Sequence, residues 1–169
     1  MPASFEDQLA VVAELLREVG RMEEGENRHS AGPALHGYER DLRLAGLAQR
    51  IAQAYTIIEG VLGYVARRID RAPVAGEDWH KELIVRCAKA YAEPPRQAVV
   101  SGALAGDLLE LCEFRHVVRN IYPTRLEAPR VRENLRLLIR TARAFDAEAR
   151  NFAAGLSPAR RSGRRQSRR

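Results

Sequence analysis

The segment from Arg115 to Tyr122 contains the densest group of chemically useful side chains in the sequence. Its five polar or titratable residues are Arg115, His116, Arg119, Asn120 and Tyr122. A guanidinium can hold a phosphoryl group, an imidazole can transfer a proton near neutral pH, and a phenol can donate a hydrogen bond. This combination near the end of one helix favours a site that binds and acts on a phosphate ester.

Arg115 occupies a helix position at which the hydrophobic pattern calls for leucine. It continues a seam with spacings of three and four residues that contains Leu104, Leu108 and Leu111. An unpaired guanidinium in a helical core would be costly, so we expect Arg115 to face a buried carboxylate, a wet cleft or a subunit interface. Glu59, the one acid between positions 54 and 66, is the expected partner. A purely structural ion pair and an arginine that also reaches a phosphate both fit this pattern.

The spacing of these residues constrains how they can meet. On an ideal helix, Arg115 and Asn120 point about 140° apart, whereas Arg115, Arg119 and Tyr122 share a face. Arg115 and Asn120 can therefore meet only if the helix unwinds before Pro123, or if two copies of the chain face each other. His116 lies with Arg119 and Asn120 on the neighbouring stripe, which favours a cleft built from two copies.

The elements that position this segment are predicted to be helices. Apolar residues recur at spacings of three and four residues through most of the chain, with the longest unbroken seam between Leu44 and Ile69 and another between Val131 and Phe152. Glycine and proline clusters separate five expected helices. Four of them span residues of about 4–24, 78–91, 97–121 and 129–155, and the second helix in the chain is roughly 30 residues long and contains the seam from Leu44 to Ile69. With no comparable strand signal, we expect an all-α, up-and-down helical bundle over residues 1–156.

The charge of the chain is concentrated at its C-terminus. The net charge of +6 equals the six arginines among the last ten residues, and without them the chain carries 22 basic and 22 acidic residues. Residues 157–169 contain almost nothing to bury, so we expect a disordered, arginine-rich tail. RNA binding through this tail is a separate hypothesis from any chemistry of the bundle.

Other sequence features limit the function classes. No apolar run is long enough for a membrane span, and the N-terminus does not resemble a secretory signal. The two cysteines, Cys87 and Cys112, are expected to be buried and reduced in a cytoplasmic protein. Four scattered histidines show no metal-ligand spacing, so we expect neither a metal site nor a cofactor. His80, near the start of the third helix, is expected to be exposed.

Residues 114–122, with the sequence FRHVVRNIY, resemble the signature of the HEPN superfamily and in particular of HepT-like ribonuclease toxins. That motif is an arginine, four to six residues, a histidine, one residue and a tyrosine. Arg115 and Tyr122 match its ends, and Asn120 stands where the family has histidine. The resemblance covers roughly residues 38–152, including Tyr55 to Glu59 on the long helix and Asp78 to His80 at the start of the third.

The resemblance implies a homodimeric, metal-independent endoribonuclease with its site in a cleft between protomers. By this resemblance, Arg115 would stabilise the scissile phosphate, with the ribose 2′-hydroxyl as internal nucleophile. Arg119 and His116 would complete the cleft, with Glu59 in support. Tyr122 would be the residue that a nucleotidyltransferase antitoxin modifies with AMP to silence the toxin.

Asn120 leaves two functions open. An amide can hydrogen-bond a phosphate or a 2′-hydroxyl, but it cannot transfer a proton near neutral pH. His116, one turn earlier, could supply the titrating group of an active enzyme. The alternative is an inactive HEPN-type helical adaptor that binds the nucleotidyltransferase or RNA without cleavage.

Overall fold

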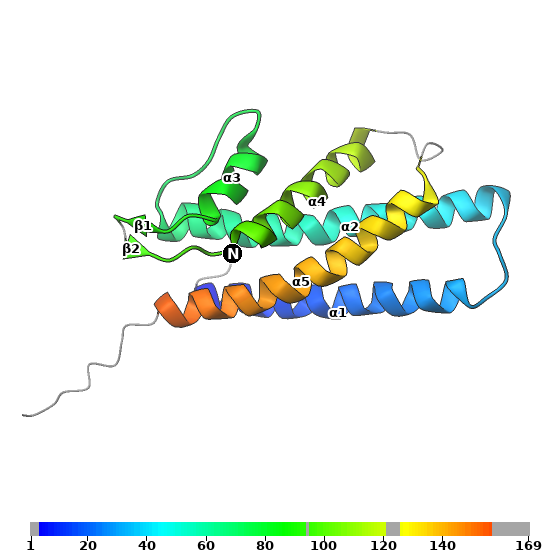
Figure 1. Ribbon diagram of the computed structural model, residues 1–169, viewed down its shortest axis with the longest axis horizontal. Helices are drawn as coiled ribbons and strands as arrows, with labels where there is room; N and C mark the ends of the chain where they lie inside the picture. The colour runs from blue at the N-terminus through cyan, green and yellow to red at the C-terminus, as the bar shows by residue number, and fades with distance from the viewer. Residues whose placement is uncertain (1–3, 94, 121–125, 157–169) are drawn as a thin grey trace, which may run out of the picture.

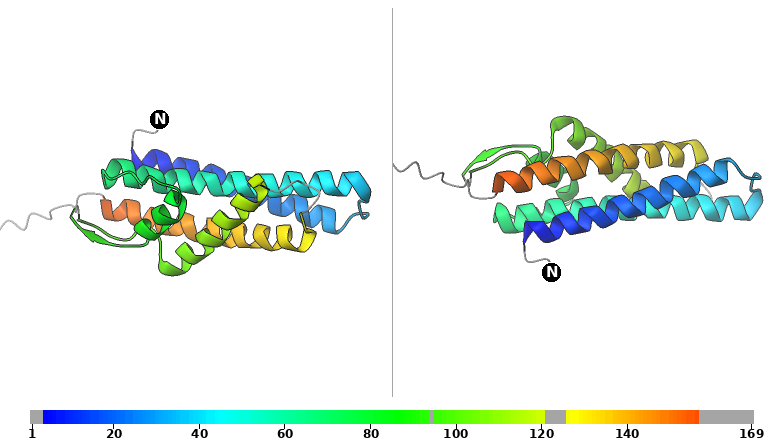
Figure 2. Two further views of the ribbon diagram at one scale, coloured as in Figure 1. Left: turned by 90° about the horizontal axis from the view of Figure 1, so that it is seen from above. Right: turned by 90° about the horizontal axis from the view of Figure 1, so that it is seen from below.

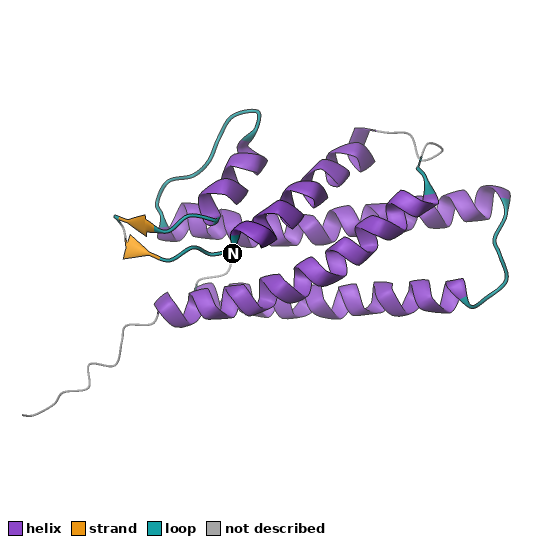
Figure 3. Ribbon diagram, in the orientation of Figure 1, coloured by secondary structure: helices purple, strands orange, loops and turns teal. Residues whose placement is uncertain are grey.

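The computed structural model describes residues 4–93, 95–120 and 126–156, and these form a helical bundle (Figures 1 and 3). The prediction of an all-α fold is confirmed. The described helices are α1 (Phe5–Ser30), α2 (Gly37–Tyr64), α3 (Trp79–Cys87), α4 (Gly102–Asn120) and α5 (Ala128–Leu156). A short π-helical segment, η1 (Val65–Ile69), extends α2, and two strands of two residues each, β1 (Tyr91–Ala92) and β2 (Pro95–Arg96), form an antiparallel pair. In the described part of the chain, no helix is long and apolar enough to cross a membrane.

The long helices α1, α2 and α5 run side by side along the molecule, and α4 crosses them at an angle (Figures 1 and 2). Helix α2 contacts α1, α4 and α5, so it is the central element of the bundle. The short α3 packs against α2 and α4. The helix that contains Arg115 therefore packs against both the central helix α2 and the short helix α3.

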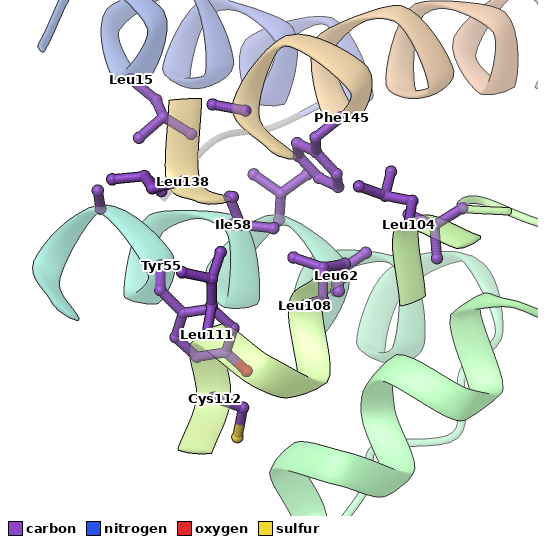
Figure 4. Packing of buried hydrophobic residues seen from close by; sticks show 14 of the residues in the cluster. Leu15, Tyr55, Ile58, Leu62, Leu104, Leu108, Leu111, Cys112, Leu138 and Phe145 are labelled. Atoms are coloured by element: carbon purple, nitrogen blue, oxygen red, sulfur yellow. The ribbon is translucent and has the colours of Figure 1, made fainter. Parts of the chain in front are cut away.

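The core lies where α2, α4 and α5 meet (Figure 4). Tyr55, Ile58 and Leu62 from α2 are fully buried there, together with Leu108 and Leu111 from α4. The seam predicted for α5 is confirmed, because each of its seven members is buried: Val131, Leu135, Leu138, Ala142, Phe145, Ala149 and Phe152. Apolar burial on this scale supplies the main stabilisation of a helical bundle and fixes the face that each helix turns inward.

Helix α1 begins as predicted but ends later than predicted. Ser4 caps it, since the Ser4 hydroxyl accepts a hydrogen bond from the Asp7 amide while the Asp7 carboxylate accepts one from the Ser4 amide. The predicted end near residue 24 is wrong, because the helix continues to Ser30. Its polar last turns are held from other helices, with Arg43 and Arg132 both donating to Glu26. Such tertiary ion pairs are not visible in the local hydrophobic pattern.

The chain between α3 and α4 also differs from the prediction. Helix α3 ends at Cys87 instead of Tyr91, and α4 begins at Gly102 instead of Gln97. The Ser101 hydroxyl caps the start of α4 by accepting a hydrogen bond from the Leu104 amide. The cause is Arg96, whose buried side chain donates to the Asp70 carboxylate at 2.8 Å and to the Lys89 carbonyl at 2.8 Å. These bonds hold the β1–β2 pair against the end of η1, so this segment cannot continue as helix.

We expect Arg96→Met to reduce the free energy of unfolding by about 3–5 kcal/mol, because it leaves the Asp70 carboxylate buried without its cation. Urea unfolding followed by far-UV circular dichroism measures this loss. The matched control is Arg150→Met, which removes an exposed ion pair with Asp146 and should cost at most about 1 kcal/mol. Equal effects of the two substitutions would contradict a structural role for the Arg96–Asp70 pair.

Candidate functional site

The site is organised around Glu59, a buried carboxylate in the middle of α2. Its side chain is only 6% exposed, yet it contacts a guanidinium and an imidazole from two other helices. Oε2 lies 3.8 Å from Nη2 of Arg115 on α4, and Oε1 forms a short contact with Nδ1 of His80 on α3. One carboxylate therefore connects α2, α3 and α4.

Arg115 forms the ion pair with Glu59 that its place in the apolar seam predicts. Its Nε also donates to the Thr56 hydroxyl at 3.1 Å, and that hydroxyl donates to the carbonyl of Ala52 at 3.0 Å. The Arg115 side chain is 12% exposed, so the guanidinium is largely enclosed while part of it faces solvent. A guanidinium held in this way keeps an orientation that it could not keep at a free surface.

His80 is the site residue that sequence reasoning missed. The expectation that it is exposed is wrong, since its side chain is 23% exposed and its Nδ1 contacts Glu59. Its ring also stacks on Trp79, with ring centroids 3.6 Å apart and planes 32° apart. The partners of His80 come from positions 59 and 79, and no local spacing in the sequence indicates the contact with Glu59.

A pocket of about 720 Å³ opens over these groups. All four predicted cleft residues line it: Arg115, His116, Arg119 and Asn120. His80 and Lys81 line it from α3, and Arg130 lines it from the first turn of α5. The acidic residues Glu77, Asp78 and Glu113 line it as well, so cations, carboxylates and two imidazoles border one pocket that suits a polar ligand.

Asn120 takes part in a local hydrogen bond. Its amide Nδ2 donates to the His116 carbonyl at 2.8 Å, and α4 remains helical through Asn120. Arg115 and Asn120 therefore border one pocket without the helix unwinding at either residue. Tyr122, the candidate modification site, lies outside the described residues, as does the tail over residues 157–169.

Two buried side chains, the Tyr55 phenol and the Cys87 thiol, are held in their neutral forms. Burial raises the pKa of the Tyr55 phenol, and nearby Cys112 and Glu59 raise that pKa further. Figure 4 shows Tyr55 beside Leu111 and Cys112 at the contact of α2 with α4. Burial also raises the pKa of Cys87 to about 12. Neither Tyr55 nor Cys87 is therefore ionised near neutral pH. Over the described residues, no three His, Cys, Asp or Glu side chains converge as a metal site.

A double-mutant cycle on Glu59→Gln and His80→Ala should give a coupling free energy of about 1–3 kcal/mol, because the buried contact links α2 to α3. The cycle compares the free energies of unfolding in urea of wild type, the two single variants and the double variant. The control cycle uses Lys81 and Glu113, which form an exposed 3.5 Å pair between α3 and α4 and should couple by less than about 1 kcal/mol. Coupling at Glu59 and His80 no larger than in this control would show that the contact does not hold α3.

Comparison with known proteins places the chain in a family. Neither the curated proteins nor the solved structures compared with the chain gave a match. The family model described as "HepT-like protein" matches residues 46–156, which is more than half of the chain. This range includes α3, α4, α5 and Glu59 on α2, and so all of the site residues described above. The chain belongs to the HepT-like protein family.

Proposed function

We propose that the protein is a HepT-like toxin that cleaves RNA without a metal ion. The observation that carries this proposal is that Arg115 is enclosed by Glu59 and Thr56 yet lines a pocket of about 720 Å³. A pocket of that volume is within the usual range for small-molecule and nucleotide sites. A fixed cation at its wall is suited to a phosphate whose charge increases during cleavage.

In this proposal the RNA supplies its own nucleophile. Arg115 holds the scissile phosphate, and Arg119 and Asn120 contact the neighbouring phosphate or ribose hydroxyl from the same helix. The adjacent 2′-hydroxyl attacks phosphorus once its proton is removed, and the 5′-oxygen leaves. His116, which also borders the pocket, is a titrating group available for one of the two proton transfers.

Regulation in this proposal acts through Tyr122 and a partner. Tyr122 follows Asn120, the last described residue of α4, by two positions. An AMP group attached there by a nucleotidyltransferase antitoxin would bring a competing phosphate to the arginines of α4. We further propose that two copies form a homodimer in the cytoplasm, each copy contributing one motif to a shared cleft.

We expect Arg115→Ala to reduce RNA cleavage by about 10²–10³-fold, because the transition state loses its fixed cation. The measurement is the single-turnover cleavage rate of purified protein on tRNA and mRNA substrates in EDTA. Arg150→Ala, an exposed arginine on α5, is the control and should cleave like wild type. The ribonuclease proposal fails if wild type and Arg115→Ala are equally inert on all substrates.

A second function is supported by Asn120, whose amide is engaged by its own helix. In that alternative the protein is an adaptor that binds the nucleotidyltransferase or RNA without cutting. We expect wild type to cleave RNA, and Asn120→His measures whether a further histidine at this position adds to that rate. Cleavage that appears only in Asn120→His would show a site lacking one group, whereas inert wild type and inert Asn120→His would favour the adaptor.

A further inference from the structure

The pocket contains a proton-transfer group outside the motif of α4. We propose that His80 on α3 is the catalytic base of this site and performs the proton transfer that Asn120 cannot perform. This inference rests on the proposed ribonuclease function, and it assigns the role to a residue 40 positions before Asn120.

The environment of His80 is that of an oriented imidazole. Its Nδ1 is held by Glu59 Oε1, so with a proton on Nδ1 the imidazole donates to the carboxylate and Nε2 keeps a free lone pair. No hydrogen bond to the described residues occupies Nε2, and His80 borders the pocket. Stacking on Trp79, at 3.6 Å between ring centroids, further restricts the ring. A carboxylate that fixes the tautomer and direction of an imidazole is how enzymes prepare a histidine for proton transfer.

The same carboxylate positions the phosphate-binding cation. Glu59 contacts His80 through Oε1 and Arg115 through Oε2. The base and the cation therefore flank one buried group, and both reach the same pocket. A phosphate held by Arg115 would bring the 2′-hydroxyl of the adjacent ribose toward His80, because the phosphate and that hydroxyl belong to one nucleotide.

The other candidate groups are less suited to this role. The Asn120 amide donates to the His116 carbonyl and has no proton-accepting nitrogen. Burial keeps the Tyr55 phenol neutral by raising its pKa. His116 borders the pocket but has no carboxylate partner among the described residues to orient it. We therefore assign the base to His80 and the acid to His116.

The reaction balances with these two histidines. Nε2 of His80 accepts the proton of the 2′-hydroxyl as O2′ bonds to phosphorus. The bond from phosphorus to O5′ breaks, and protonated His116 donates a proton to O5′. The products are a 2′,3′-cyclic phosphate and a 5′-hydroxyl, and the two histidines return to their starting forms by exchanging one proton each with water.

The test compares four variants with wild type in single-turnover RNA cleavage. We expect His80→Ala and His80→Gln to be slower than wild type by about 10²–10⁴-fold, the usual contribution of general base catalysis. Glutamine retains a side-chain donor for Glu59 but cannot accept the proton, so it separates catalysis from positioning. The control is His36→Ala, an exposed histidine before α2, which should cleave like wild type. Added imidazole should restore part of the rate of His80→Ala and leave Arg115→Ala unchanged.

The outcomes distinguish this inference from the proposed function. Binding of RNA with a 2′-deoxy cleavage site, and thermal unfolding, should be close to wild type for His80→Gln. Cleavage by His80→Gln at the wild-type rate, while Arg115→Ala is inert, would overturn the assignment of the base but would still support the ribonuclease function. Loss of activity that is accompanied by loss of folding or RNA binding in both His80 variants would also overturn it. Inert wild-type protein would overturn both proposals.

Discussion

The burial of Glu59 is the constraint on which the site depends. A carboxylate in the middle of a core helix is unfavourable unless cations and hydrogen-bond donors surround it. Here the donors come from His80 on α3 and Arg115 on α4, so satisfying one charge fixes how three helices meet. The same contacts hold a guanidinium and an imidazole at the wall of one pocket. The contacts of Glu59 thus contribute both to the stability of the bundle and to the geometry of the site.

The rest of the fold supplies a rigid frame for that interaction. Helix α2 is buried along most of its length and packs against α1, α4 and α5, which keeps Glu59 in place. The short α3 could not hold its position by itself, because nine residues bury little surface. It is fixed at one end by the contact of His80 with Glu59 and by the packing of Trp79 against the core, and the chain that follows it is fixed by Arg96 and Asp70. Functional groups held by such supporting contacts keep their geometry better than groups on free loops.

The sequence predicts the features that repeat along the chain or break its pattern. Helical periodicity predicts the bundle and the core face of α5, and an arginine in a leucine seam predicts the pair of Arg115 with Glu59. His80 and Arg96 are missed because neither interrupts an apolar seam, and only the tertiary fold brings them to their partners 21 and 26 positions away. The end of α1 is missed for a similar reason, since interhelical ion pairs at Glu26 support turns that lack an apolar seam. Local patterns thus identify the motif on α4, while its supporting residues emerge from packing.

We propose above that RNA is cleaved by its own 2′-hydroxyl in the pocket beside Arg115. The most direct measurement is the chemistry of the product ends, obtained by end labelling and mass spectrometry after cleavage in EDTA. Attack by the 2′-hydroxyl predicts 5′-hydroxyl ends, which a polynucleotide kinase labels without phosphatase treatment, and 2′,3′-cyclic phosphates on the other fragment. Products with 5′-phosphate ends would contradict it, because those ends require water or another external nucleophile in place of the 2′-hydroxyl.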